Sequence, residues 1–310
     1  MVLLTMVATA ITLLINSCSN SNGVVKIGYL KISASLPAFV IQEQKYFENE
    51  GIEYELTPFQ TSNQLVDALA ANQIDIIVEC SAVPVLASES KNPEKIKIFA
   101  YSDISLERPF DAIISNNDSI KELNDLEGKK IGVFPGSTAQ TLLEAFLKSK
   151  EINTSGISYI PITPSNMIDS LESGYIDALH TYEPTTSIAL NTGKFHEVFG
   201  TVYGHMQSPN PQGVACISNS FYTQDKRLAT KTIEIFNKAY EFIENNESLA
   251  KGYLTDYIKL DKEVALRSGL LYFISSKIFD SKYYYEYANT LKDLGEIDKV
   301  VKYEAISILN

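Results

Sequence analysis

The sequence predicts an α/β protein with two similar lobes, and an internal repeat is the main evidence for this fold class. The tripeptide Lys-Ile-Gly at 26–28 recurs at 130–132, and Ser-Asn at 62–63 recurs at 165–166. Each copy reads as alternating short strands and helices, which is the pattern of βαβ units. Two copies are too few for a solenoid, so we expect two lobes that face each other. A cleft of this kind is the usual place for a small ligand.

Length and charge narrow the classes of function. A chain of 310 residues corresponds to about two domains, and its 45% hydrophobic and 21% charged residues are ordinary for globular cores. Lys and Arg number 26 against 38 for Asp and Glu, which gives a formal net charge of −12. A chain this acidic, without a basic run, lacks the positive face that phosphates require. We therefore expect no nucleic-acid partner.

The first residues are typical of an export signal. Residues 1–15 are almost wholly apolar, and they are too short to cross a bilayer comfortably. Ile-Asn-Ser-Cys follows at 15–18 and resembles a bacterial lipobox, in which the cysteine is lipidated. We expect a signal peptide at 1–17, a lipid anchor at Cys18 and a linker at 18–23, so that the protein is held outside the cytoplasm on the cell membrane. A plain signal peptide and an internal hydrophobic segment are the alternatives.

Local signals place the elements of the first lobe in order. Pro37 suits the first turn of a helix, where a missing N–H costs nothing, and Gly51 ends that helix. The alternation over 52–56 is typical of a half-buried strand, and Ser62 with Asn63 provides a helix cap. The expected elements are strands at 24–29, 52–56, 74–78 and 96–101 and helices at 37–49, 62–71 and 82–89.

The second lobe is expected to repeat this order. Its strands are predicted at 111–115, 130–133, 157–160 and 176–179, and its helices at 139–150, 166–173 and 184–192. A segment rich in proline and glycine, 204–213, then reads as a return linker to a strand at 213–217. Apolar stripes predict a mostly helical chain from 221 to 310, with the tyrosines at 283–287 packed inside. The chain would hinge at the two crossings, near 102–109 and 204–213.

Cysteine and histidine give no sign of a metal site. Cys80 and Cys216 each lie beside an apolar strand, where a thiol behaves as a small buried hydrophobe, and a disulfide between them is open. His180 and His196 are expected to be core or solvated histidines, because no pair has ligand spacing. We expect no cofactor, no metal and no catalytic residue.

Four stretches of sequence resemble a known family. They lie at 26–29 with 46–53, at 126–133, at 135–140 and at 182–184, where Tyr-Glu-Pro stands. Over residues 24–268 the chain is similar to solute-binding proteins of ABC importers, in the nitrate/sulfonate/taurine and thiamine-precursor branch. The resemblance implies a type II periplasmic-binding-protein architecture of two lobes, each a mixed β-sheet flanked by helices. Lobe one would hold 24–105 plus 213–310, and lobe two 106–212.

One loop is the main candidate for ligand binding. Pro135 and Gly136 allow a tight turn, Ser137 is expected to cap a helix that starts near Ala139, and Thr138 lies between them. Exposed N–H groups and the positive end of the helix dipole would then face the cleft. The alternative is an ordinary helix-capping turn.

Further candidates lie after other strands. Ser35 follows the first Lys-Ile-Gly strand, and Ser81 follows the strand at 74–78 and precedes a helix. Glu183 would accept a hydrogen bond from an amine or amide of the ligand, or would instead be a carboxylate placed at a helix start. His205, near the return linker, is a weaker candidate.

These observations predict an extracytoplasmic lipoprotein, a monomer, that captures a small polar or anionic ligand and delivers it to an ABC permease in the membrane. Sulfonate, taurine, nitrate, bicarbonate and a formylated aminopyrimidine all remain open as ligands. The alternative is an enzyme of the same fold, such as a pyrimidine synthase of thiamine biosynthesis. Such a synthase should carry a clustered cysteine motif, and the three cysteines of this chain are far apart.

Overall fold

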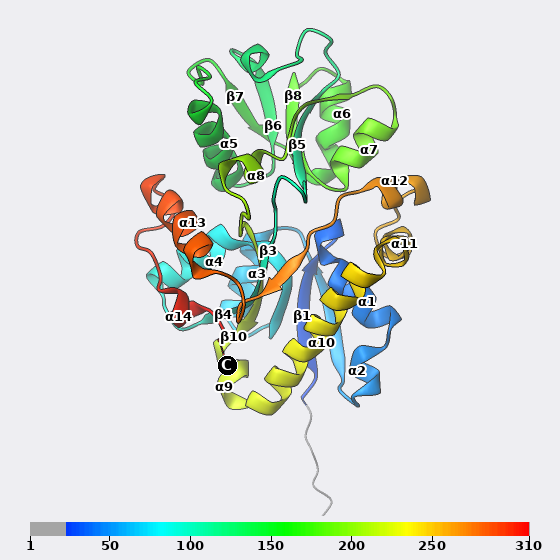
Figure 1. The fold of residues 1–310 in the computed structure, drawn as a ribbon, viewed down its shortest axis with the longest axis vertical. Helices are drawn as coiled ribbons and strands as arrows, with labels where there is room; N and C mark the ends of the chain where they lie inside the picture. Colours follow the sequence, from blue (N-terminus) through cyan, green and yellow to red (C-terminus); the bar gives the residue numbers. More distant parts are fainter. Residues whose placement is uncertain (1–22, 310) are drawn as a thin grey trace, which may run out of the picture.

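Two mixed β-sheets form the framework of the protein (Figure 1). The computed structural model describes residues 23–309, apart from the side chain of Ser137. The larger sheet has the order β11-β4-β10-β3-β1-β2, with β1 parallel to β2 and β3, and β10 antiparallel to β3 and β4. Its strands are β1 (Val25–Leu30), β2 (Tyr54–Phe59), β3 (Ile76–Ser81), β4 (Ile96–Ser102), β10 (Gly213–Ser218) and β11 (Phe273–Ser275).

The smaller sheet has the order β7-β6-β8-β5-β9 and takes all its strands from the middle of the chain. In it, β6 is parallel to β7 and β8, and β5 is antiparallel to β8 and β9. Its strands are β5 (Asp111–Ser115), β6 (Lys130–Val133), β7 (Ser158–Pro161), β8 (Ala178–Tyr182) and β9 (His196–Gly200). Two mixed sheets flanked by helices confirm the predicted fold class.

The sequence repeat corresponds to matching local structure in the two lobes. The backbone N–H of Lys26 donates to Asp75 at 2.9 Å, and that of Lys130 donates to Asp177 at 2.8 Å. Each repeated glycine lies under an isoleucine: a Cβ on Gly28 would come within 2.6 Å of Ile74, and a Cβ on Gly132 within 2.5 Å of Ile176. The repeat therefore records one packing arrangement used twice, in which the glycine admits a neighbouring side chain.

The first helices largely follow the expectation, with two corrections. The helix predicted at 37–49 is two helices, because Lys45 adopts a left-handed backbone with φ of 53°. The cap of the next helix is Thr61, whose hydroxyl accepts from the N–H of Gln64 at 3.3 Å, and not Ser62. These helices are η1 (Ser33–Ser35), α1 (Leu36–Glu43), α2 (Tyr46–Asn49), α3 (Ser62–Ala70) and α4 (Ala82–Lys91).

In the second lobe the principal helix begins earlier than expected. α5 starts at Ser137 and has Gly136 at its N-cap position, so the prediction that Ser137 caps this helix is wrong. A glycine there is explained by its φ of 121°, which other residues rarely adopt. The helices of this lobe are η2 (Leu123–Leu126), α5 (Ser137–Ser149), η3 (Pro164–Asn166), α6 (Met167–Glu172), α7 (Thr185–Asn191) and α8 (Val202–Met206).

The last ninety residues return to the larger sheet and are mostly helical, as predicted. α10 buries Ile233, Phe236 and Ile243 along one face, and it packs against α1 (Figure 1). Tyr284 and Tyr287 are buried, which confirms the expected packing of the tyrosine cluster. The helices are α9 (Asn219–Gln224), α10 (Lys226–Asn245), α11 (Glu247–Tyr257), α12 (Lys262–Arg267), α13 (Ser281–Asp293) and α14 (Tyr303–Ile306).

The two chain crossings between the sheets lie against each other. Ile104 and Asn210 form an antiparallel bridge, in which the N–H of Asn210 donates to the carbonyl of Ile104 at 2.7 Å. A Cβ on Gly204 would lie 2.9 Å from the carbonyl carbon of Ser105, so the absence of a side chain lets these backbones approach. The segments expected to hinge are thus paired to one another.

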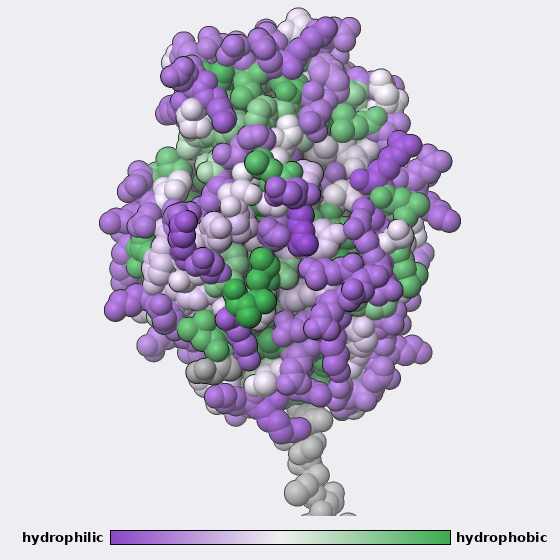
Figure 2. All heavy atoms as spheres, in the orientation of Figure 1, coloured by the Kyte–Doolittle hydropathy of each residue, from purple (hydrophilic) through white to green (hydrophobic). Residues whose placement is uncertain are grey.

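The interior of the protein is apolar, and its visible surface is mostly hydrophilic. Cys80 and Cys216 are buried free thiols. Hydrophilic residues cover most of the face shown in Figure 2, with hydrophobic residues in separate patches. Within residues 23–309, no helix is long and apolar enough to span a membrane. The predicted signal segment and Cys18 lie outside the described residues.

Candidate ligand-binding site

A cavity of about 400 Å³ lies between the two sheets and is lined from both. Strands and helices of the larger sheet contribute one wall and those of the smaller sheet the other. Its wall from the larger-sheet side includes Leu30, Ile32, Ser62, Asn63, Glu79, Ser81 and Glu296, and its wall from the smaller-sheet side includes Phe110, Phe134, Gly136, Thr138 and Tyr182. Of the predicted site residues, Ser81, Gly136 and Thr138 therefore come together here.

The loop before α5 reaches the cavity, and the first turn of α5 contacts a carboxylate of the protein. Gly136 stands at the N-cap with open space around its Cα. Thr138 in the first turn donates its hydroxyl hydrogen to Oε2 of Glu296 at 3.2 Å. Glu296 follows α13, so this hydrogen bond joins the two sides of the cleft. A carboxylate of the protein itself thus lies beside the first turn of α5, where the helix dipole favours negative charge. The side chain of Ser137 lies outside the described part of the structure.

A polar corner forms around Ser81. Its hydroxyl oxygen accepts from the N–H of Val83 at 3.4 Å, which caps α4, and from the side-chain amide of Gln212 at 3.3 Å. The backbone N–H of Ser81 donates to the hydroxyl of Ser62 at 3.1 Å. With its oxygen accepting twice, the Ser81 hydroxyl has its hydrogen left to donate into the cavity.

Glu79 is the lining residue that the sequence reasoning missed. It stands on β3 among apolar residues, is only 6% exposed, and its Oε2 has no hydrogen-bond partner among the described residues. Burial raises its pKa to about 8, because a charged carboxylate is poorly solvated there. A glutamate inside the apolar run 76–80 was the available signal, since a charged residue in a central strand is uncommon.

Aromatic side chains form the opposite wall. Phe134 and Tyr182 meet edge to face, with ring centroids 5.8 Å apart. The hydroxyl of Tyr182 pairs with that of Tyr203 at 2.8 Å, which fixes the direction of the ring. Burial raises the pKa of Tyr182 above its ordinary value, and the charges of Asp111 and Glu79 raise it further.

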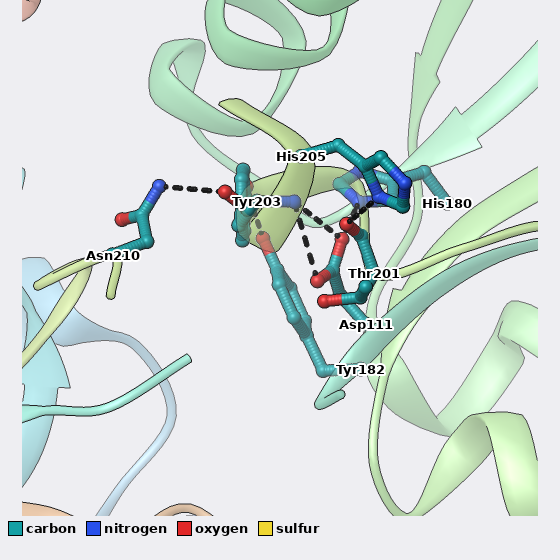
Figure 3. A network of polar contacts seen from close by, with 7 residues as sticks. All are labelled: Asp111, His180, Tyr182, Thr201, Tyr203, His205 and Asn210. Atoms are coloured by element: carbon teal, nitrogen blue, oxygen red, sulfur yellow. Dashed lines mark hydrogen bonds and ion pairs between the residues drawn. The ribbon is translucent and has the colours of Figure 1, made fainter. Parts of the chain in front are cut away.

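A buried polar network supports this wall (Figure 3). Nε2 of His180 lies 3.0 Å from Oδ2 of Asp111, and the backbone N–H of Tyr203 donates to the same carboxylate at 3.4 Å. The side-chain amide of Asn210 donates to the carbonyl of Tyr203 at 3.0 Å. Through Asn210 the network runs from the cavity wall to the paired crossings. His180 is fully buried, in agreement with the core role expected of it.

Three predicted residues lie away from the cavity lining. Ser35 is fully buried in η1, and its hydroxyl has no partner among the described residues. The carboxylate of Glu183 accepts from the N–H of Ser187 at 3.2 Å and from its hydroxyl at 2.9 Å, which is the helix-start arrangement. Burial raises the pKa of Glu183, and hydrogen bonds from Gly269 and Ser187 oppose this. His205 packs on Phe199.

The fold and the interlobe cavity define a two-lobed binding protein of the type II periplasmic architecture. Residues 20–252 match the model of the NMT1-like family, and the chain belongs to this family. A Bacillus subtilis protein named as an aliphatic sulfonates-binding protein is 25% identical over 254 residues, which cover 80% of this chain and 75% of that protein.

Solved structures share the fold. The ligand-binding component of an ABC-type import system from Staphylococcus aureus matches with a TM-score of 0.76 and 20% identity, over 92% of this chain and 96% of that one. The periplasmic aliphatic sulphonate binding protein SsuA from Escherichia coli matches with a TM-score of 0.74 and 15% identity, over 91% of each chain. The Staphylococcus aureus structure has zinc bound. In residues 23–309 of this chain, no group of three or more His, Cys, Asp or Glu is placed to hold a metal.

Proposed function

We propose that the protein is the solute-binding component of an ABC importer and captures a small polar ligand between its lobes. The observation that carries this proposal is the interlobe cavity, because both sheets line it and Thr138 on one side meets Glu296 on the other. Closure around a ligand would bring these walls together by rotation at the paired crossings. Lobe one would comprise 24–105 plus 213–310, and lobe two 106–212.

Binding without catalysis fits the site better than the enzymatic alternative. The curated relatives are named binding proteins, and the Bacillus subtilis relative is named for aliphatic sulfonates. The cavity brings together serines, amides and carboxylates, and the cysteine near it, Cys80, is a buried thiol whose pKa is raised by burial. A buried protonated thiol is a poor nucleophile.

Anchoring and delivery complete the proposal. Cys18 would be lipidated and would hold the protein at the outer face of the membrane, and the loaded protein would dock as a monomer on a permease. Support comes from the apolar segment before Cys18 in the sequence and from the import system named for the Staphylococcus aureus structure.

The proposal is tested by a ligand screen followed by scattering. Thermal shifts are measured with taurine, methanesulfonate, nitrate, bicarbonate and a formylated aminopyrimidine; a ligand at 100 times its dissociation constant stabilises by about 2.7 kcal/mol. Any solute that raises the melting temperature is then followed by small-angle scattering, where closure predicts a smaller radius of gyration.

A variant that fills the cavity is the control. Ala87 on α4 lines the cavity, whereas Ala71, just after α3, is exposed and outside the lining. Ala87→Trp should abolish the thermal shift, and Ala71→Trp should leave it unchanged. Equal shifts in both variants would place the ligand outside the cleft and contradict the proposal.

A further inference from the structure

In the described part of the chain, the cavity is lined by acidic groups and by no basic side chain. Among its described lining residues, Glu79 and Glu296 are carboxylates, and no lysine, arginine or histidine accompanies them. A free anion in this space would find no cation among these residues to balance its own charge, and it would lie near the carboxylate of Glu296. The charge of the cavity therefore favours a ligand with a positive group.

Glu79 has a carboxylate oxygen without a hydrogen-bond partner among the described residues, and a ligand in the cavity could supply one. Gly213 on β10 leaves room for its side chain, because a Cβ at Gly213 would lie 3.2 Å from Oε1 of Glu79. The other oxygen, Oε2, is buried and accepts no hydrogen bond from any described residue. Buried polar atoms in folded proteins nearly always have a partner, so an unpartnered oxygen in a cavity wall indicates a bound group. When Glu79 is ionised, that group has to be a donor, since an ionised carboxylate only accepts.

A carboxylate already lies beside the place where an anion would be expected. The N-terminus of α5 would attract a sulfonate or nitrate through its N–H groups and dipole. The carboxylate of Glu296 accepts from Thr138 there at 3.2 Å. An incoming anion would therefore meet the like charge of Glu296 beside the start of the helix.

The remaining wall is suited to an apolar body. Leu30 and Ile32 line one side of the cavity, and Phe110, Phe134 and Tyr182 line the other. Aromatic faces of this kind hold flat rings, and they also attract cations that lie over them. The cavity thus combines space for an apolar group with the carboxyl group of Glu79.

We propose that the ligand is a small organic cation, with a protonated amine or amidine on an apolar or aromatic body, whose N–H groups pair with the carboxylate of Glu79. This inference rests on the proposed binding function of the same cleft. The pair would be a charge-assisted hydrogen bond and would satisfy Oε2. Sulfonate or nitrate alone lacks the required group, whereas the amine of an amino-sulfonate supplies it.

The pKa of Glu79 supports the assignment and gives it a signature. Since burial raises this pKa to about 8, the empty site is mostly protonated at neutral pH, and a bound cation has to displace that proton. The titratable groups near Glu79 are the thiol of Cys80 on the same strand, the phenol of Tyr182 on β8 and the carboxylate of Glu296 in the same cavity lining.

The test uses three probes with the same ring and different charge. Benzamidine is cationic, benzamide is neutral and benzenesulfonate is anionic, and their affinities are measured by calorimetry on the full chain at pH 8. We expect benzamidine to bind most tightly. Glu79→Gln should weaken benzamidine at least about tenfold, because it removes a charged acceptor, and should change benzamide little. Glu55→Gln, an exposed glutamate on β2, is the matched control and should bind as the unaltered protein does.

The outcomes separate this inference from the function on which it rests. Glu79→Gln keeps the side-chain shape, and thermal melts confirm that the variant is folded before affinities are compared. If benzenesulfonate binds at least as well as benzamidine and the protein still closes in scattering, the binding function stands and the cation assignment is overturned. If no probe and no solute of the screen binds, the proposed function fails as well.

Discussion

Thr138 and Glu296 meet across the cleft, with the threonine hydroxyl donating to the carboxylate at 3.2 Å. Thr138 lies in the first turn of α5, and Glu296 lies more than one hundred and fifty residues later, after α13. The contact has two consequences. It places a negative charge beside the first turn of a helix, and it links the two sides of the cavity.

Loss of this link should favour separation of the lobes. Thr138→Val keeps the shape of the side chain and removes the hydroxyl, at a cost of about 1 kcal/mol to the joined arrangement. We expect a larger radius of gyration for the ligand-free variant in small-angle scattering. Thr163→Val, at an exposed position of the same lobe, is the control and should match the unaltered protein. Identical profiles for both variants would show that the contact does not hold the lobes.

Glu79 should make the stability of the ligand-free protein depend on pH. Its folded-state pKa of about 8 lies above its ordinary value of 4.5, so the folded state keeps a proton that the unfolded state loses. The stability that this proton contributes is fully present below about pH 4.5. It is lost as the pH rises to 8, by on the order of 3–5 kcal/mol. Chemical denaturation from pH 5 to 9 should show a smaller decline for Glu79→Gln. Parallel curves for the two proteins would refute the burial argument.

Two glycine substitutions should act in opposite directions. Gly136 has open space around it but a φ of 121°, so Gly136→Ala should cost about 1–3 kcal/mol through backbone strain alone. Gly252 lies within α11, also with open space, and Gly252→Ala should stabilise by about 0.5–1 kcal/mol. Denaturant melts of the two variants measure both changes. A neutral Gly136→Ala would mean that the loop before α5 relaxes without strain.

Cys18 should decide where the protein resides in the cell. If it is the lipidated residue, Cys18→Ser should move the protein from the membrane fraction to the soluble fraction. Cys216→Ser, which alters a buried thiol on β10, is the control and should leave the fractionation unchanged. Membrane retention of the Cys18→Ser protein would contradict the lipobox interpretation.

Short-range patterns were enough to predict most of the fold. The strand at 130–133 was predicted with its observed bounds, because Lys-Ile-Gly there repeats the tripeptide of the first strand. β9 and β11 were missed, since each is short and is held in place by a distant strand, β5 and β4 respectively. Pairing of that kind leaves little local signal.

The candidate site was less predictable for the same physical reason. Ser81 and Gly136 were found because helix starts and tight turns have local signatures. Glu183 is held by Ser187 and Gly269 and lies outside the lining, whereas Glu79 lies in the cavity wall without a partner. Only the tertiary structure tells these two carboxylates apart, because it shows which of them already has its hydrogen bonds.

The affinity of benzamidine as a function of pH tests the central claim most directly, namely that Glu79 holds the ligand in the interlobe cleft. The probe stays cationic from pH 6 to 9, so the titration of the protein sets the profile. Because the pKa of Glu79 is about 8, affinity should rise about tenfold per pH unit up to that point and then level off. Glu79→Gln should flatten the profile. An affinity that is constant or falls as the pH rises would contradict the account.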